Sequence, residues 1–222
     1  MRHMAVAIGL IVLGLGRLGA TDEPRSAQRA PAPQAATPTA PEAPKPEVGY
    51  YPTTQDVVEK MLDLAKVTPR DHVCDLGCGD GRFVVTAAQR YGCRATGYEL
   101  DEKLVTAGRD RIRQAKLERT ARIEQRDLFT VDLSDTTVVM LFLLPHMNAR
   151  LIPQLRKMPA GSRIVAHEFE IPGLRPDQEL TWVSQLDKSE HVIYVYSIPL
   201  RSADKPADKP ADKPADKPAD KP

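Results

Sequence analysis

Apolar and polar positions follow two periods along the middle of the chain, and each period predicts one kind of element. Short runs that are almost wholly apolar are typical of strands buried on both faces of a parallel sheet. Apolar positions three and four residues apart predict helices that pack one face against such a sheet. The apolar runs predict five strands, at residues 72–76, 94–100, 121–126, 137–144 and 163–169.

Segments with a helical period fall between these strands. The predicted helices are one that ends before Pro69 and three at residues 82–91, 101–117 and 148–158. Thr53 and Asp56 have the spacing of a capping box for the first helix, and Asp101 is the expected N-cap of the third.

Two apolar stretches near the end of the chain, residues 182–186 and 192–198, predict a closing pair of strands. Strands that alternate with helices imply a parallel sheet covered by helices on both faces. The sequence therefore predicts an α/β fold with a Rossmann-like seven-stranded sheet, mostly parallel, with an antiparallel hairpin at one edge.

Both ends of the chain lack this pattern. Residues 1–20 have a basic start and an apolar run, and this is typical of a secretory signal peptide or, if uncleaved, of a membrane anchor. Residues 21–48 are rich in Ala and Pro and predict an extended linker. The tail, 202–222, contains five copies of Ala-Asp-Lys-Pro, which predict a disordered segment because the prolines forbid a helix. The folded domain is therefore expected at 49–201.

Charge and cysteine content narrow the classes of function. The formal net charge is only +1, so there is no global argument for a nucleic-acid partner. The three cysteines lack the spacing of metal ligands and are expected to be packing residues. The five histidines are scattered and offer no ligand pair along the sequence, so no metal is expected.

A glycine-rich turn follows the first predicted strand. Gly77, Gly79 and Gly81 let the backbone turn tightly and approach a bound nucleotide. Glu99 ends the next strand, where its carboxylate can accept hydrogen bonds from both hydroxyls of a ribose. Together these features predict a site for a cofactor that contains adenosine. An ordinary turn between strand and helix is the alternative.

The spacing and the charges of the turn select the cofactor. The dinucleotide fingerprint is G-x-G-x-x-G, whereas this turn reads G-x-G-x-G. Asp75 and Asp80 flank it, and they would repel a pyrophosphate but attract a sulfonium or an amino group. The motif D-L-G-C-G-D-G resembles the first motif of class I methyltransferases that use S-adenosylmethionine (SAM). The resemblance implies SAM as the methyl donor and S-adenosylhomocysteine as the product.

Polar residues also end the other predicted strands, where open α/β sheets bind their ligands. Asp127 follows the third strand and is a candidate for binding the adenine amino group, with Leu128 covering the ring. A loop cap is the alternative role for Asp127.

Longer motifs between residues 50 and 172 resemble a narrower family. The segments Y-Y-P-T-T, G-C-R-A-T-G-Y-E-L, R-D-L-F and F-L-L-P resemble the mitochondrial protein-lysine methyltransferases that modify the ATP synthase c-subunit and the adenine nucleotide translocase, and their bacterial relatives. The segment from Tyr51 to Val58 is also similar to the Dot1 histone-lysine methyltransferases. The resemblance implies a protein lysine as acceptor, and it places Tyr51 and Thr53 near the methionine part of the cofactor.

A lysine acceptor must lose its proton before it attacks the methyl group. Glu168 and His146 lie at strand ends and are the candidates for accepting that proton or orienting the amine. A small-molecule or lipid acceptor and a SAM-binding module without turnover are the alternative functions. No nucleic-acid partner is expected, and the chain is expected to be a monomer.

The N-terminal segment and the cofactor point to different compartments. An export signal or anchor predicts a membrane-anchored or exported protein, and the acceptor is then a candidate for a membrane-embedded protein. SAM is made in the cytoplasm, which leaves a cytoplasmic location as the alternative.

Overall fold

The computed structural model of the chain describes residues 49–204. The predicted signal or anchor segment, the linker and nearly all of the predicted tail lie outside these residues. Among the helices that are described, none combines the length and the apolar character needed to cross a membrane.

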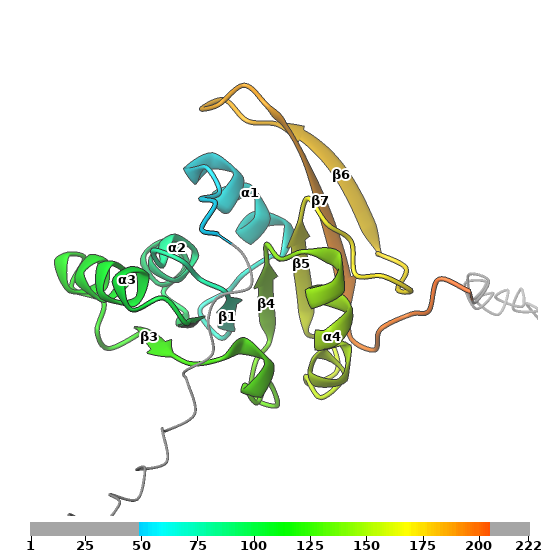
Figure 1. Ribbon diagram of the computed structural model, residues 1–222, viewed down its shortest axis with the longest axis horizontal. Helices are drawn as coiled ribbons and strands as arrows, with labels where there is room; N and C mark the ends of the chain where they lie inside the picture. Colours follow the sequence, from blue (N-terminus) through cyan, green and yellow to red (C-terminus); the bar gives the residue numbers. More distant parts are fainter. Residues whose placement is uncertain (1–48, 205–222) are drawn as a thin grey trace, which may run out of the picture. The chain divides into compact units, whose positions relative to one another are not determined.

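Between residues 49 and 204, seven strands form one sheet in the order β3-β2-β1-β4-β5-β7-β6 (Figure 1). The first five are parallel, and β7 and β6 are antiparallel at one edge. The predicted fold class is thereby confirmed. The strands are β1 (His72–Leu76), β2 (Arg94–Glu99), β3 (Ala121–Gln125), β4 (Val138–Leu141), β5 (Arg163–His167), β6 (Gln178–Val183) and β7 (Glu190–Ser197).

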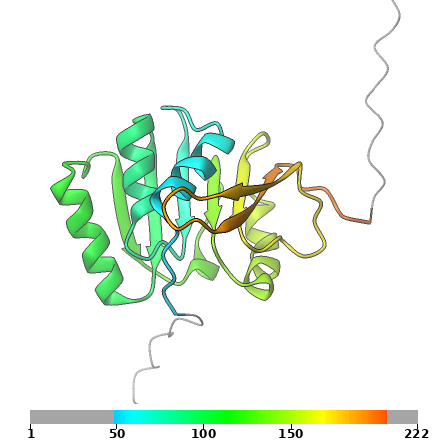
Figure 2. The same cartoon turned by 90° about the horizontal axis from the view of Figure 1, so that it is seen from above.

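Helices flank the sheet on both sides (Figure 2). The apolar residues of α1 (Gln55–Leu64), α2 (Arg82–Tyr91) and α3 (Glu102–Gln114) share one core cluster with one face of the sheet. The other face packs against α4 (Pro145–Leu155) and the short 3-10 helix η1 (Leu128–Thr130).

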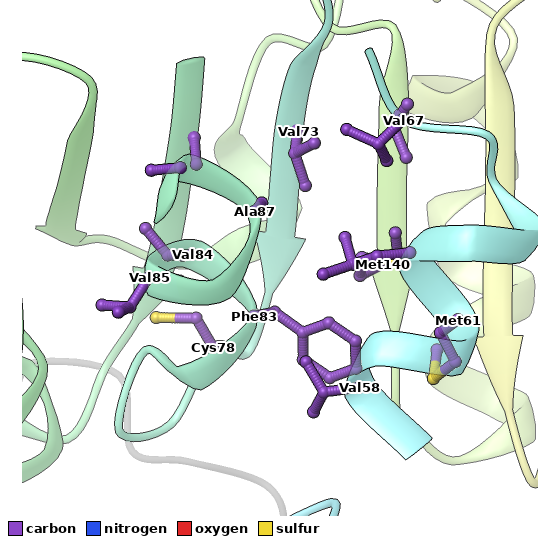
Figure 3. Packing of buried hydrophobic residues seen from close by; sticks show 14 of the residues in the cluster. Val58, Met61, Val67, Val73, Cys78, Phe83, Val84, Val85, Ala87 and Met140 are labelled. Carbon is purple, nitrogen blue, oxygen red and sulfur yellow. The ribbon is translucent and has the colours of Figure 1, made fainter. Parts of the chain in front are cut away.

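Strand β4 shows why the central strands are almost wholly apolar. Val138 and Met140 belong to the core cluster on the α1–α3 side, whereas Val139 belongs to the cluster on the α4 side. Alternate residues of a strand point to opposite faces, so a strand covered on both faces needs apolar residues throughout. Figure 3 shows this packing on the α1–α3 side, where the ring of Phe83 from α2 faces Val58 from α1.

Gly97 on β2 allows α2 to lie close to the sheet. A Cβ atom there would lie 2.5 Å from Cys78 Sγ and 2.9 Å from Val84 Cγ2. We therefore expect Gly97→Ala to lower the free energy of unfolding by about 1–3 kcal/mol, the usual cost of overpacking a core. Urea unfolding measures this change. Gly49→Ala is the matched control, because no atom lies within 4 Å of its Cβ position. Equal stability of the two variants would contradict the expectation.

Two predicted strands run more than one residue too far at their ends. β4 ends at Leu141 instead of residue 144, because its neighbour β1 ends at Leu76 and turns away. β5 ends at His167 instead of residue 169, since Glu168 adopts a left-handed backbone with φ 61°.

The later elements are shifted along the chain. Helix α4 begins at Pro145 instead of Asn148, since the fixed φ of proline suits the first helical turn. Strand β6 covers Gln178–Val183 instead of 182–186, because its position is set by pairing with β7.

The predicted capping box of α1 is wrong. The N-cap is Thr54, and its side chain makes no capping hydrogen bond. The Asp56 carboxylate instead accepts hydrogen bonds from Ser184 Oγ and from the backbone N–H of Gln185, in the β6–β7 loop. The predicted N-cap of α3 is confirmed, because the Asp101 carboxylate accepts two backbone hydrogen bonds there. The three cysteines are free and buried, as expected of packing residues.

A buried ion pair joins the amino ends of the parallel strands. The Asp71 carboxylate accepts hydrogen bonds from Arg163 Nη1 at 2.8 Å, from Thr137 Oγ1 at 2.7 Å and from the backbone N–H of Thr68 at 2.7 Å. Arg163 Nε donates to the Ala65 carbonyl, just after α1. Burial by itself would raise the pKa of Asp71, but these hydrogen bonds lower it well below its ordinary value. Asp71 therefore stabilises the fold as an anion.

Candidate functional site

A cavity of about 940 Å³ opens at the carboxyl ends of β1–β5. This is the edge at which open α/β sheets bind ligands, and the volume suits a small organic molecule. Every predicted cofactor residue except Gly81 lines it, namely Tyr51, Thr53, Asp75, Gly77, Gly79, Asp80, Glu99, Asp127 and Leu128.

The glycine turn brings backbone to the wall of the cavity. The N–H groups of Gly77 and Cys78 both donate to the Tyr98 carbonyl, which fixes the end of β1 against β2. Gly79 has φ 51°, and a Cβ atom there would lie 2.4 Å from the ring of Tyr50. Only glycine fits this position without displacing the tyrosine.

Gly81 serves packing rather than the cavity. It is the N-cap of α2 with φ 75°, and its Cβ position lies 2.5 Å from Ile123 Cδ1 and 3.4 Å from the Cα of Gly108. The third glycine of the motif therefore lets α2 approach α3 and β3.

Glu99 is held rigidly at the end of β2. Its carboxylate accepts hydrogen bonds from the backbone N–H groups of Gly79 at 3.0 Å, Leu100 at 2.7 Å and Asp101 at 3.0 Å. A carboxylate offers about four acceptor positions, so the group retains capacity for a ligand hydroxyl. Glu99 thus links the glycine turn to β2 and presents a preoriented acceptor to the cavity.

Asp75 is a buried carboxylate that lacks a partner on one oxygen. It is 4% exposed, and its Oδ2 atom makes no hydrogen bond. Burial, together with the nearby charges of Glu99 and Asp80, raises the pKa of Asp75 to about 8. Because buried polar atoms are almost always paired, this oxygen indicates a ligand with a donor group or positive charge.

The contacts of Asp80 differ from its expected role, which is to attract a cationic ligand. Its carboxylate pairs with Arg82 at 2.9 Å and Arg111 at 2.6 Å. Burial by itself would raise the pKa of Asp80, but the two guanidinium groups lower it below the ordinary value. The charge of Asp80 is therefore already neutralised within the fold.

Arg82 has a role that no motif in the sequence indicated. Besides pairing with Asp80, its guanidinium donates to the Thr53 carbonyl and to Tyr50 Oη, the latter at 3.1 Å. Arg82 thereby fastens the segment before α1 to the glycine turn, and this segment forms one wall of the cavity.

Asp127 caps a turn as well as lining the cavity. Its Oδ1 atom accepts a hydrogen bond from the backbone N–H of Phe129 at 2.9 Å, which starts η1. The guanidinium of Arg150 lies 3.7 Å from the centre of the Phe129 ring. The loop-cap role is present, and contact with a ligand stays a prediction.

The far end of the cavity is aromatic and apolar. Phe142 follows β4 and Phe169 follows β5, with ring centroids 6.5 Å apart and planes 20° apart. Leu143 and Leu144 continue this lining. Neither phenylalanine was among the predicted site residues, although both follow strand ends.

The two predicted catalytic residues do not line the cavity. His146 is exposed in the first turn of α4. Glu168 turns toward His191 on β7, with 2.9 Å between Glu168 Oε1 and His191 Nδ1. The positions of His146 and Glu168 therefore give no support to the predicted catalytic roles, which stay predictions.

Several known proteins are similar to this chain in sequence. Residues 75–178 match the family model of the ANTKMT methyltransferase domain. A protein-lysine N-methyltransferase of Saccharolobus islandicus is 40% identical over 155 residues, which cover 69% of this chain and 95% of that protein. The adenine nucleotide translocase lysine N-methyltransferase of Mus musculus is 36% identical over 132 residues, covering 59% of this chain and 57% of that protein, so the match spans little more than half of it.

A solved structure resembles this chain, and the match covers nearly the full length of the chain in that structure. The structure is described as an RNA methyltransferase from Salinibacter ruber in complex with S-adenosyl-L-homocysteine. It has a TM-score of 0.62 and 34% sequence identity, over 71% of this chain and 98% of that chain.

Proposed function

Because this chain belongs to the family of SAM-dependent methyltransferases that includes the protein-lysine N-methyltransferase of Saccharolobus islandicus, we propose that it transfers a methyl group from SAM to the side-chain amine of a protein lysine. The observation that carries this proposal is the division of the cavity. The carboxylates of Asp75, Glu99 and Asp127 lie at the ends of β1–β3, whereas the lining residues in the loops that follow β4 and β5 are aromatic or apolar.

The polar half fits SAM group by group. The unpartnered oxygen of Asp75 suits the ammonium of the methionine part, and the fixed carboxylate of Glu99 suits the ribose hydroxyls. Leu128, which is buried, would cover one face of the adenine.

The aromatic half suits a lysine side chain. Bound SAM supplies a methyl group that its sulfonium has already activated, so the protein mainly has to align the acceptor and exclude water. The stacked rings of Phe142 and Phe169 would pack along the alkyl chain of lysine. Their apolar surroundings would disfavour the charged ammonium and so lower the pKa of the lysine amine. This leaves the neutral amine, which is the nucleophile.

Labelled SAM tests the acceptor class. Purified chain is incubated with SAM that carries a tritiated methyl group and with a whole-cell extract, and the products are treated with ribonuclease or protease. We expect label in protein that survives ribonuclease, and mass spectrometry should find it on lysine. A Glu99→Ala variant is the background control.

Two other outcomes would overturn the lysine proposal. Label that ribonuclease removes would assign an RNA acceptor, as in the description of the Salinibacter ruber structure. Label that extracts into organic solvent or into the metabolite fraction would assign a lipid or small molecule.

The raised pKa of Asp75 gives a pH dependence for cofactor binding. An ammonium placed beside Asp75 favours the anion, so binding releases a proton from a group whose pKa is about 8 in the free protein. Affinity for SAM should therefore fall as pH decreases below 8, by up to about tenfold per pH unit. Calorimetry at several pH values measures this slope. Asp75→Asn should bind more weakly and lose the slope, and an unchanged slope in that variant would exclude Asp75 as its origin.

We also propose that residues 1–20 direct the protein to a membrane, and that its acceptor is a membrane protein. The apolar run after the basic start supports this, and the enzyme proposal does not depend on it. In the extract experiment, the labelled protein should then sediment with membranes. A reporter active only after export, fused after residue 48, should show activity for an exported domain and none for a cytoplasmic one. Label confined to soluble protein would reject the membrane acceptor.

A further inference from the structure

The fold brings three side chains together outside the cavity, and each of them directs one nitrogen or oxygen atom toward a common point. His167 Nε2 lies 3.0 Å from His191 Nδ1 and 3.2 Å from Glu168 Oε1, and the last two atoms are 2.9 Å apart. We propose that these three residues, the His–Glu–His cluster, bind one divalent first-row transition-metal ion. This site is separate from the methyl-transfer proposal.

Two features of the backbone bring the side chains together. Consecutive residues of a strand normally point to opposite faces, yet His167 and Glu168 reach the same point. Glu168 makes this possible with φ 61°, a conformation that non-glycine residues rarely adopt and that is found preferentially at functional sites. On β7, the pairing of His167 with Ile193 puts His191 diagonally across from His167 on the same face.

In each histidine, the hydrogen bond made by the ring nitrogen that faces away from the cluster determines whether the other ring nitrogen can coordinate a metal ion. His191 Nε2 lies 3.2 Å from Asp187 Oδ2, and a carboxylate only accepts, so Nε2 carries the hydrogen. His191 Nδ1 faces a second carboxylate, with 2.9 Å between this nitrogen and Glu168 Oε1. Two acceptor atoms at this distance need a proton or a metal ion between them. The charges of Glu168 and Asp187 both favour that cation.

His167 also has a hydrogen-bond partner for the ring nitrogen that faces away from the cluster. Its Nδ1 atom lies 3.3 Å from Thr53 Oγ1, which can accept a hydrogen bond and leave Nε2 free to coordinate. Histidines that bind metals typically donate their other ring N–H to a carboxylate or a similar acceptor, and this fixes the ring orientation. Asp187 and Thr53 provide such partners for the two rings.

The spacing matches a metal site. Three ligand atoms at about 2.1 Å from an ion lie about 3.4 Å apart at the tetrahedral angle and about 3 Å apart at right angles. The observed separations of 2.9–3.2 Å therefore match three neighbouring positions of a five- or six-coordinate ion. Two imidazoles and one carboxylate select first-row transition metals over magnesium or calcium. The His167 side chain is 2% exposed, whereas that of Glu168 is 29% exposed. The ion therefore has access from the Glu168 side, where water can complete its coordination.

The cluster joins β5 to the antiparallel β6–β7 edge of the sheet. Through Thr53 it also reaches the wall of the cavity, but none of its three ligands lines that cavity. We therefore expect the ion to stabilise this edge and not to take part in methyl transfer.

Metal titration of the full-length chain tests the proposal. Protein treated with a chelator is titrated with Zn²⁺ by calorimetry and with Co²⁺ followed by visible absorption. We expect one ion per chain, and bound Zn²⁺ should raise the unfolding temperature. His191→Ala should abolish binding. Glu168→Gln should weaken it, and Asp187→Asn should raise the Kd about 10- to 100-fold, as loss of a partner of a metal ligand usually does. His146→Ala, which changes an exposed histidine outside the cluster, should bind Zn²⁺ like the wild type.

Two results would overturn the site. One is absence of Zn²⁺ and Co²⁺ uptake by the wild-type chain, which would mean that a proton shared among the three groups holds the cluster together. The other is undiminished uptake by His191→Ala, which would place the ion elsewhere. SAM binding by each variant verifies that it has folded, and the conservative Glu168→Gln change keeps the test valid if His191→Ala fails to fold.

Discussion

Glu99→Ala is expected to weaken SAM binding by about 2–4 kcal/mol, the value of a charge-assisted pair of hydrogen bonds. This corresponds to a roughly 30- to 900-fold rise in Kd. The ribose would lose its acceptor, and the N–H groups of Gly79, Leu100 and Asp101 would lose theirs as well. The glycine turn would thus be less well fixed in the variant, which places the effect toward the upper end.

Isothermal titration with SAM and with S-adenosylhomocysteine measures this loss. Glu102→Ala is the matched control, because Glu102 is an exposed glutamate three residues away at the start of α3. It should bind both ligands like the wild type. Wild-type affinity in Glu99→Ala would refute the assignment of Glu99 to the ribose.

Asp71→Ala should lower the free energy of unfolding by about 3 kcal/mol. Removing one partner of a buried ion pair typically costs about 3–5 kcal/mol, and the lower end applies because Arg163 keeps contact with water. The variant leaves the guanidinium without its anion and removes the acceptor for Thr68 and Thr137. Urea unfolding at pH 7 measures the loss. Glu59→Ala breaks an exposed ion pair with Arg90 and should cost less than about 1 kcal/mol.

The effect of Asp71 should depend on pH with a defined sign. Its pKa is lower in the folded chain than in the unfolded chain, so its contribution is complete above the ordinary carboxyl pKa of about 4. The contribution is lost as pH falls below that value toward the folded pKa. The difference in stability between wild type and Asp71→Asn should therefore shrink in acid. A constant difference between pH 7 and pH 3 would show that the charge of Asp71 is not its origin.

The sequence was most informative where a residue's role depends on its own segment. The apolar run of β1 and the three glycines after it specify a strand and a tight turn without reference to distant residues. Strand β6 was misplaced because it is an edge strand without a continuous apolar run, so its pairing with β7 fixes its position.

Features that depend on strand pairing could not be predicted from the sequence. His167 and His191 are 24 residues apart and share no motif, and only the antiparallel register brings them together. Phe142 and Phe169 likewise meet because β4 and β5 are neighbours. The engagement of Asp80 by Arg111 depends on how α3 packs beside α2.

The ion pair of Asp71 and the cofactor residues lie at opposite ends of the same strands. Strand β1 separates Asp71 from Gly77, and its five residues span about 17 Å. Changes farther apart than about 10 Å usually contribute additively, because they share no partners. Substitutions at the amino ends can therefore be used to raise or lower global stability while SAM affinity stays constant. The protein thus offers two independent regions for engineering, one that adjusts its tolerance to mutation and another that can be varied to change which acceptor it methylates.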